Sequence, residues 1–395
     1  MPRTPAHPET VTSSTGVSPL VLLQLSISNI LAHKARNLAA GAGICFAIFL
    51  IILQWGLLLA AKKESTLLYE YFDFDLALVS EGYQFMYSAK GFDRIRLIQA
   101  RALPVVDDTF SLSIGKADWV DPDTDLRSAT MVVGIDPKAE FITDPLIRDE
   151  LARLRSNRDL LVDRLSQPDL GPLERGRRAR LNRQEVEIAG FFELGFFFYA
   201  EGSVLVKNEV FPRYTGRGAR DITVGMIRLR PGADPQAAQR RLTALLPGEV
   251  VVMTRSQLID QEQAYFVDIK PLGIMFQSGV LVAFLTGLVV LFQVTSTDVG
   301  TRLKEYATLK AMGFGGAAVY GTALGQILML SLAAFLPAVG ISAWLFHLVR
   351  ELTHLPLELS PQLLSLVLAL TLGMNLLAGV TTLSRLSRAH PADLF

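Results

Sequence analysis

The chain contains four long apolar stretches in which no Asp, Glu, Lys or Arg occurs. A hydrocarbon core of about 30 Å takes about 20 helical residues, so each stretch is long enough to cross a membrane. Glycines open the third stretch, which delays the expected helix start, and Pro337 is expected to kink that helix. The sequence therefore predicts transmembrane helices over 38–61, 271–297, 317–347 and 359–384.

The polar block between the first two spans, residues 62–270, is long enough for one or two domains of its own. Alternating apolar residues predict strands at Leu76–Val79, Met131–Ile135 and Val186–Phe192, and a helix is expected over Gln236–Leu246. The block is therefore predicted to be a mixed α/β domain. The aromatic run Phe196–Tyr199 is expected either in the sheet or along a groove for lipid or a partner.

A densely charged segment within this block, about 145–187, repeats leucine and isoleucine at helical spacing. Pro168–Pro172 interrupts the pattern, and a second basic stretch follows. We expect a protruding helical hairpin here. Its arginines form either a solvated face or a site for an acidic ligand.

Basic residues lie on one side of the predicted spans. Cytoplasmic flanks are rich in Lys and Arg, so this side is predicted to be cytoplasmic, with both chain termini there and 62–270 outside. Lys62 and Lys63, just after the first span, oppose this assignment. The basic flank residues are Lys34, Arg36, Arg302, Lys304, Lys310, Arg385 and Arg388.

The remaining pieces are terminal. Residues 1–17, rich in Pro, Thr and Ser, are expected to be a disordered tail, and residues 18–37 a cytoplasmic amphipathic helix. Residues 385–395 are expected to be a cytoplasmic tail.

Composition narrows the possible functions. The 38 basic residues balance the 38 acidic ones, so no overall charge attracts nucleic acid. Half of the residues are hydrophobic and the mean hydropathy is +0.34, too apolar for an ordinary water-soluble globule. The single cysteine, Cys45, excludes an intrachain disulfide and a Cys-based metal cluster.

Sequence signatures of enzymes are missing. The chain has no phosphate-binding loop, because its Gly115-Lys116 pair is followed by Ala117. Its five histidines are scattered without a H-E-x-x-H pattern, and no G-x-S-x-G motif occurs. We therefore predict no catalytic, cofactor-binding or metal-binding residues, and work driven from outside the chain. A membrane enzyme has only scattered carboxylates in its favour.

The connection between the second and third spans is the most informative segment. Residues 298–313 are expected to form a short helix, capped by Thr297 or Asp298 and ended by Gly313. Such a helix, joined directly to two spans, is suited to act as a lever, although a partnerless helix on the membrane surface is the alternative. Its apolar stripe consists of Val299, Leu303, Tyr306 and either Leu309 or Lys310.

This connection resembles a known family. Residues 305–313, Glu-Tyr-Ala-Thr-Leu-Lys-Ala-Met-Gly, resemble the E-x-[GA]-x-L-[RK]-A-[LM]-G signature of FtsX-like and MacB-type ABC transporter permeases. Residues 25–37 and 384–393 resemble the family's amphipathic N-terminal segment and its C-terminal ending. Residues 186–195 and 293–313 are similar to the DevC subfamily, whereas Phe196–Tyr199 is more aromatic than that subfamily suggests.

The resemblance implies a non-catalytic permease subunit of four spans that forms a homodimer and binds a separate ABC ATPase, where ATP and magnesium are bound. It also implies a periplasmic adaptor, an outer-membrane channel and the bacterial inner membrane. The DevC likeness implies export of an amphiphilic cargo such as a glycolipid. The ATPase-coupling residues would be Arg302, Glu305, Tyr306, Leu309, Lys310, Met312 and Gly313, and weak dimer-packing candidates are Gly41, Gly43, Gly321 and Gly325.

A second function is compatible with the same pattern. An FtsX-like signal transmitter would use the outer domain to activate a periplasmic partner and move no cargo. Both interpretations share the lever between spans two and three, so they differ only in what the outer domain does.

Overall fold

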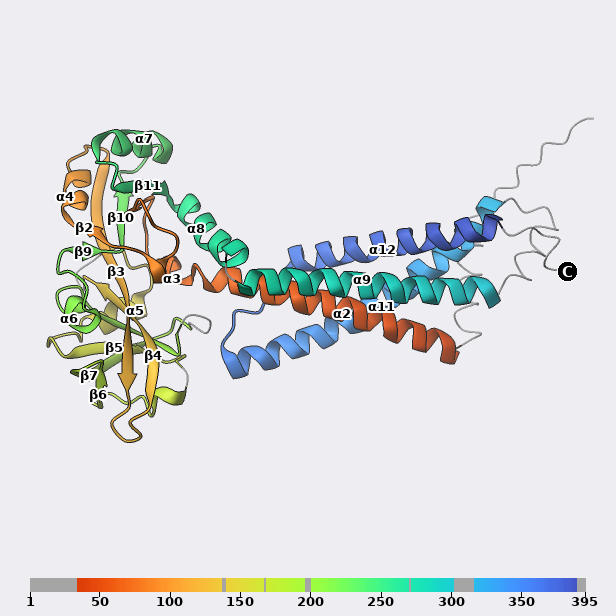
Figure 1. The fold of residues 1–395 in the computed structure, drawn as a ribbon, viewed down its shortest axis with the longest axis horizontal. Helices are drawn as coiled ribbons and strands as arrows, with labels where there is room; N and C mark the ends of the chain where they lie inside the picture. Colours follow the sequence, from red (N-terminus) through yellow and green to blue (C-terminus); the bar gives the residue numbers. More distant parts are fainter. Residues whose placement is uncertain are drawn as a thin grey trace, which may run out of the picture. The chain divides into compact units, whose positions relative to one another are not determined.

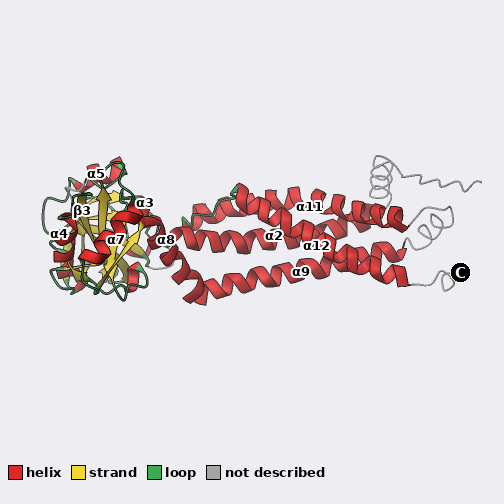
Figure 2. Cartoon of the chain, turned by 90° about the horizontal axis from the view of Figure 1, so that it is seen from above, coloured by secondary structure: helices red, strands yellow, loops and turns green. Residues whose placement is uncertain are grey.

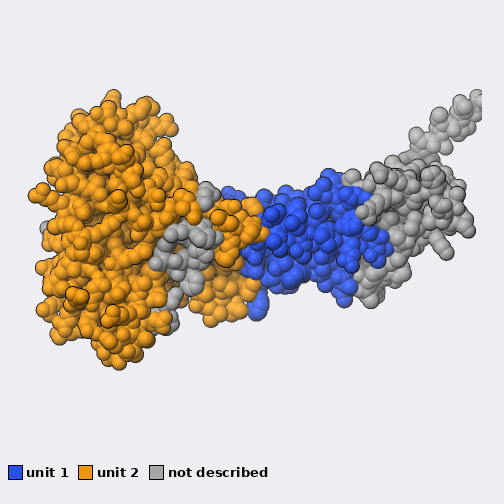
Figure 3. Space-filling view, viewed as in Figure 1, with its two compact units in different colours: residues 1–54, 279–344, 359–395 blue, residues 55–278, 345–358 orange. Residues whose placement is uncertain are grey.

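The computed structural model describes residues 34–136, 140–166, 168–195, 200–269, 271–301 and 316–388. The chain divides into two compact units, shown in Figure 3. One, the membrane unit, comprises residues 1–54, 279–344 and 359–395. The other, the β unit, comprises residues 55–278 and 345–358. Each unit is described by itself.

Four long helices supply the membrane-spanning segments (Figure 2). They are α2 (Lys34–Glu64), α9 (Pro271–Thr301), α11 (Gly316–Thr353) and α12 (Pro361–Arg388). Their stretches long and apolar enough to cross a membrane are Leu38–Glu64, Gly273–Val294, Ile327–Thr353 and Pro361–Gly379. The four predicted spans are thereby found as helices, and α11 continues through Pro337.

Helix α9 does not end where the sequence suggested. The proposed cap, Thr297, lies inside the helix, and its hydroxyl donates to the Gln293 carbonyl at 2.8 Å. This bond to the residue four positions earlier is typical of threonine within a helix rather than at a cap. The first four residues of the predicted lever, 298–301, therefore continue the second span.

The β unit begins with a split βαβ arrangement. Strands β1 (Leu76–Ser80), β3 (Val106–Val120), β10 (Val224–Leu229) and β11 (Val250–Thr254) pair antiparallel in the order β11-β1-β10-β3. Helix α4 (Ile95–Arg101) connects β1 to β3, and α7 (Pro235–Leu245) connects β10 to β11. This strand order, with one helix in each crossover, is the ferredoxin-like pattern.

A second, barrel-like part is inserted between β3 and β10 (Figure 1). The second half of β3 pairs with β4 (Arg127–Ile135), and β4 pairs with β8 (Gly202–Lys207). The ring continues through β5 (Asp159–Asp163), β7 (Gln184–Phe192) and β6 (Arg178–Leu181), which returns to β3 at Trp119 and Val120. Closure leaves this ring without open edges. Short elements of the unit include β2 (Phe92–Asp93), β9 (Asp221–Ile222), α5 (Pro145–Leu151), α6 (Phe211–Thr215) and the 3-10 turn Pro168–Leu170.

Alternating side chains build separate cores on the two faces of these strands. Leu76 and Leu78 pack beneath α4 and α7, whereas Ala77 and Val79 contribute to the core on the opposite face of β1. In the barrel, Val132 lies in the interior with Trp119, whose ring nitrogen donates to the Leu170 carbonyl at 3.0 Å. Period-two alternation with both faces covered explains why β1 is buried along its whole length.

The predicted helical hairpin at 145–187 is wrong. Only α5, Pro145–Leu151, is helical near its start, and β5, β6 and the first part of β7 occupy most of the rest. Leu160 and Val162 fill the barrel, whereas Leu161 points to the other core, so strand alternation replaces the helical period. The charges that suggested solvated helices lie on the barrel surface, as in the Arg158–Glu185 pair at 3.3 Å.

The predicted fold class is confirmed: four apolar spans, with a large mixed α/β domain between the first and the second. The strands expected at Leu76–Val79, Met131–Ile135 and Val186–Phe192 are present as β1, β4 and β7. The aromatic run 196–199 lies outside the described residues.

Candidate functional site

The predicted ATPase-coupling residues, Arg302 to Gly313, lie outside the residues that the structure describes. The helices that flank them are described: α9 ends at Thr301 and α11 begins at Gly316. Their coupling role stays a prediction from the sequence.

The predicted dimer-packing glycines lie in two membrane helices, Gly41 and Gly43 in α2, and Gly321 and Gly325 in α11. A Cβ atom on Gly43 would lie 3.0 Å from the Val290 side chain, and one on Gly41 would lie 3.6 Å from Leu330. Gly43 therefore lets α2 pack closely on α9 of its own chain, whereas a Cβ at Gly41 would make an ordinary contact. A role between two copies of the chain stays a prediction.

The candidate site that the structure does describe is the set of chain segments where membrane helices enter the β unit. Three segments of the β unit belong to it: the end of α2, the turn between α11 and α12, and the run from α8 (Arg255–Ala264) into the start of α9. These segments are the covalent connections between the two units.

The end of α2 is fixed by close packing and an ion pair. A Cβ on Gly56 would overlap the tip of the Phe346 ring, so a larger residue here would require that ring to move. The Lys63 ammonium lies 2.9 Å from the Glu358 carboxylate in the turn between α11 and α12. Both side chains are largely exposed, so the pair adds little stability.

The turn between α11 and α12 is held by buried leucines. Leu355 and Leu357 are buried, and His354 adopts a left-handed backbone with φ of 57°. The His354 carbonyl oxygen lies 3.8 Å from the Cβ position of Gly195, just after β7. The turn therefore packs against the barrel part of the β unit.

The run from α8 into α9 contains a break in helical geometry. A capping box of Thr254 and Gln257 begins α8, and Tyr265–Ile269 then form a π-helical turn before α9. A Cβ on Gly273 would lie 2.0 Å from the Val267 carbonyl oxygen, six residues earlier. Such turns bend helices and often occur at functional sites. Leu58, Ala61, Val267 and Phe276 pack around the turn.

A buried carboxyl group attaches α8 to the body of the β unit. The side chain of Glu262 is fully buried and accepts hydrogen bonds from the Tyr69 hydroxyl at 3.1 Å and from the Tyr83 hydroxyl. The Met86 backbone N–H donates to its two oxygens at 3.1 and 3.3 Å. Burial raises the pKa of Glu262 to about 7, although these three donors act to lower it.

Sequence reasoning missed Glu262. It lies in a polar stretch, Gln261-Glu262-Gln263, that reads as a solvated helix surface. The available signal was its spacing of four residues from Leu258, which places both side chains on one helical face. Both are fully buried in the structure.

A second buried carboxyl group, Asp163 at the end of β5, has a structural role. It accepts hydrogen bonds from the backbone N–H groups of Leu165, Leu194 and Gly195 and from the Ser203 hydroxyl, at 2.8–3.1 Å. Burial raises its pKa, against the effect of these donors. The carboxyl fixes the chain where β7 ends.

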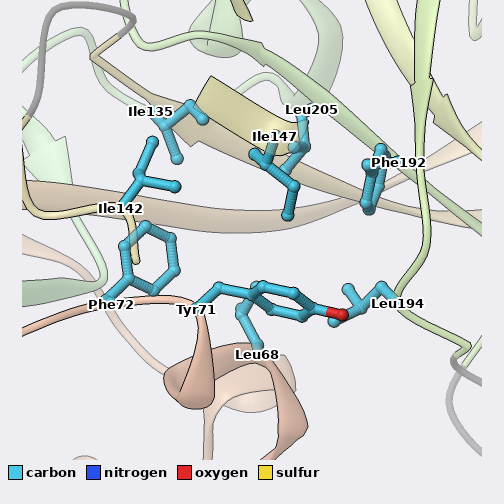
Figure 4. Close-up of a pocket in the computed structure, with 9 residues that line it drawn as sticks. All are labelled: Leu68, Tyr71, Phe72, Ile135, Ile142, Ile147, Phe192, Leu194 and Leu205. Carbon is cyan, nitrogen blue, oxygen red and sulfur yellow. The ribbon is translucent and has the colours of Figure 1, made fainter. Parts of the chain in front are cut away.

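An apolar pocket lies beside α3 (Leu67–Glu70) in the β unit (Figure 4). Its volume is about 10 Å³, room for about one water molecule and too little for an amphiphilic cargo. Within the described ranges, no group of three or more His, Cys, Asp or Glu side chains is arranged to hold a metal ion. The pocket is lined by Leu68, Tyr71, Phe72, Ile135, Ile142, Ile147, Phe192, Leu194 and Leu205.

One protein family matches the membrane helices of this chain. Residues 278–391 match the family described as FtsX-like permease C-terminal. The match covers α9 from its second turn, α11 and α12. The four apolar helices and this match indicate a membrane protein, and its last three spans are similar to the C-terminal domain of FtsX-like permeases.

Solved structures similar to this chain include two domains from outside the cytoplasm. One is the periplasmic region of MacB from Actinobacillus actinomycetemcomitans, with 8% identity, a TM-score of 0.35, and coverage of 49% of this chain and 94% of that one. The other is the extracellular domain of the noncanonic ABC-type transporter YknZ from Gram-positive bacteria, with 13% identity, a TM-score of 0.31, and coverage of 45% and 98%. No curated protein matches the chain significantly.

Proposed function

We propose that this chain is the permease subunit of an ATP-driven ABC exporter of the MacB and DevC type. A separate ATPase binds the segment 302–313 and drives the spans, and the β unit acts outside the membrane on an amphiphilic cargo such as a glycolipid. A periplasmic adaptor and an outer-membrane channel complete the route, and two copies of the chain form the permease in the bacterial inner membrane.

The FtsX-like match over 278–391 is the observation that carries this proposal. The matched region includes the segment whose sequence resembles the coupling signature, and the helices on both sides of that segment are spans. Chain connectivity supports the same arrangement. Helix α9 follows α8 of the β unit and crosses once, so the 302–315 connection is expected on the opposite membrane face, where a cytoplasmic ATPase is accessible.

The decisive test uses the expected contact residue Leu309. Leu309→Asp places a charge in the apolar stripe, and Leu309→Met keeps its volume and polarity. With the ATPase co-expressed, we expect Leu309→Asp to remain membrane-inserted, to lose copurification, and to lower the stimulation of ATP hydrolysis at least tenfold. Leu309→Met should behave as the native chain. Unchanged binding and hydrolysis in Leu309→Asp would overturn the proposal.

The export step needs its own measurement. The native chain, its ATPase and the adaptor can be reconstituted in vesicles that contain labelled glycolipid. ATP-dependent glycolipid release supports export. Intact ATPase stimulation with no release, together with activation of a periplasmic hydrolase, would favour the signal-transmitter function instead.

A further inference from the structure

The attachment of α8 to the β unit is built around one acid. Glu262 is anchored from α3 by Tyr69 and from the segment 83–86 by Tyr83 and the Met86 N–H. The two tyrosine hydroxyls also lie 2.8 Å from each other. In a site buried this completely, an apolar residue such as leucine would be enough to pack α8 against the rest of the β unit. A titratable group in its place makes this packing depend on pH.

We propose that Glu262 is a proton-sensitive clasp: the protonated carboxyl group holds α8 firmly against α3 and residues 83–86, and loss of the proton weakens this attachment. Other contacts accompany the clasp. The Gln261 side chain donates to the Tyr83 carbonyl at 2.7 Å, the Arg255 guanidinium donates to the Tyr69 carbonyl at 3.2 Å, and the Tyr265 ring stacks on Phe85 at 4.3 Å. These contacts keep α8 in place in both protonation states, so the clasp adjusts the strength of an existing joint.

The carboxyl is the group that changes charge near neutral pH. Burial and the neighbouring Glu262 raise the pKa of Tyr83 well above its usual value, so this hydroxyl keeps its proton. Burial and the charge of Glu64 do the same for the pKa of Tyr87. Ionisable residues on the elements around α8 are Lys62, Lys63 and Glu64 on α2, Glu70 and Tyr69 on α3, Glu81, Tyr83 and Tyr87 near the 3-10 turn Met86–Ser88, Tyr265 in the π-helical turn, and Arg255 and Asp260 on α8 itself.

The direction of the pH effect follows from linkage. The pKa of Glu262 is about 7 in the folded joint and about 4.5 for an exposed glutamate. The closed joint therefore binds the proton more tightly than the open joint. Its added stability is complete below about pH 4.5, falls as the pH rises, and is gone above about pH 7.

The position of the clasp gives it a consequence for movement. Helix α8 leads through the π-helical turn 265–269 into α9, a membrane span. When α8 is firmly attached, a displacement of α9 is transmitted to the rest of the β unit. When the attachment is weaker, part of the displacement is taken up by movement of α8 itself. This consequence rests on the proposed transmission function, but the clasp itself does not.

Hydrogen–deuterium exchange of the full chain in lipid nanodiscs, without ATPase, tests the clasp alone. The opening constant of a peptide covering 255–264 is measured from pH 5 to 8.5, after division by the intrinsic exchange rate at each pH. We expect it to rise by up to about tenfold per pH unit between about pH 5 and 7 and to level off above that.

Three variants complete the test. Glu262→Gln removes the titrating group, so its profile should be flat, whereas the exposed Asp260→Asn on the same helix should keep the native slope. Tyr83→Phe removes a donor to the carboxylate, so the plateau of its opening constant should begin about a pH unit higher. This variant tests the clasp even if Glu262→Gln does not fold. A flat native profile, or a slope retained in Glu262→Gln, would overturn the clasp, and neither result would bear on ATPase coupling.

Discussion

At the scale of single residues, two buried carboxyl groups do different things in the same unit. Asp163 accepts hydrogen bonds from three backbone N–H groups and a hydroxyl within one barrel, whereas Glu262 joins a helix to two other segments. Both are fully buried. Removal of Asp163 should therefore affect stability, and removal of the Glu262 charge should affect the response to pH.

Asp163→Ala leaves buried backbone donors without an acceptor, each worth about 1–3 kcal/mol. We expect the β unit to lose about 3 kcal/mol or more of unfolding free energy, measured by denaturant unfolding of the detergent-solubilised chain. Asp163→Asn keeps one acceptor oxygen and should lose less. Equal stability of Asp163→Ala and the native chain would show that these hydrogen bonds do not hold the barrel.

At the scale of elements, the π-helical turn is the feature that no pattern in the sequence revealed. The apolar run from Pro271 predicted the second span, and a polar run precedes it. The π-helical turn lies between these two runs. There the backbone of Val267 approaches Gly273 too closely for any side chain at 273. Glycine occurs too often in this chain for Gly273 by itself to predict such a turn.

Gly273→Ala should disturb this turn. Its methyl group cannot be placed 2.0 Å from a carbonyl oxygen, so the backbone must move, at a cost of about 1–3 kcal/mol. Gly340→Ala in α11 is the matched control, because nothing lies within 4 Å of its Cβ position. We expect a lower midpoint of thermal unfolding for Gly273→Ala, and an unchanged or higher one for Gly340→Ala. Identical midpoints would mean that the turn has no need of glycine.

Helices α11 and α12 are joined by a buried polar pair. The Ser331 hydroxyl donates to the Asn375 side-chain oxygen at 2.9 Å, and both residues are buried. Ser331→Ala should cost about 0.5–1.5 kcal/mol, as interhelical hydrogen bonds in membranes do. Ser342→Ala should be nearly neutral, because that hydroxyl bonds only within its own helix, to the Ala338 carbonyl. Unfolding in mixed micelles measures both, and equal costs would argue against a specific interhelical role.

At the scale of the whole molecule, the sequence predicted the spans and the α/β block, but not the architecture of that block. Long apolar runs are a strong local signal, whereas barrel closure depends on pairing between distant strands, such as β3 with β6. The helical spacing of Ile147, Leu151 and Leu154 held only for α5 and its end, and alternation on β5 then placed Leu160 and Leu161 in different cores. The site was missed for a related reason: Glu262 is buried against Tyr69 and Tyr83, which lie 193 and 179 residues away in the chain.

We propose that movement produced by a separate ATPase reaches the β unit through α9, the π-helical turn and α8. Hydrogen exchange across 255–269 in the reconstituted complex, with and without a non-hydrolysable ATP analogue at constant pH, tests it most directly. We predict a change in protection on nucleotide binding that disappears in Leu309→Asp and persists in Leu309→Met. Protection that is identical in both nucleotide states, in a complex that hydrolyses ATP, would contradict the claim.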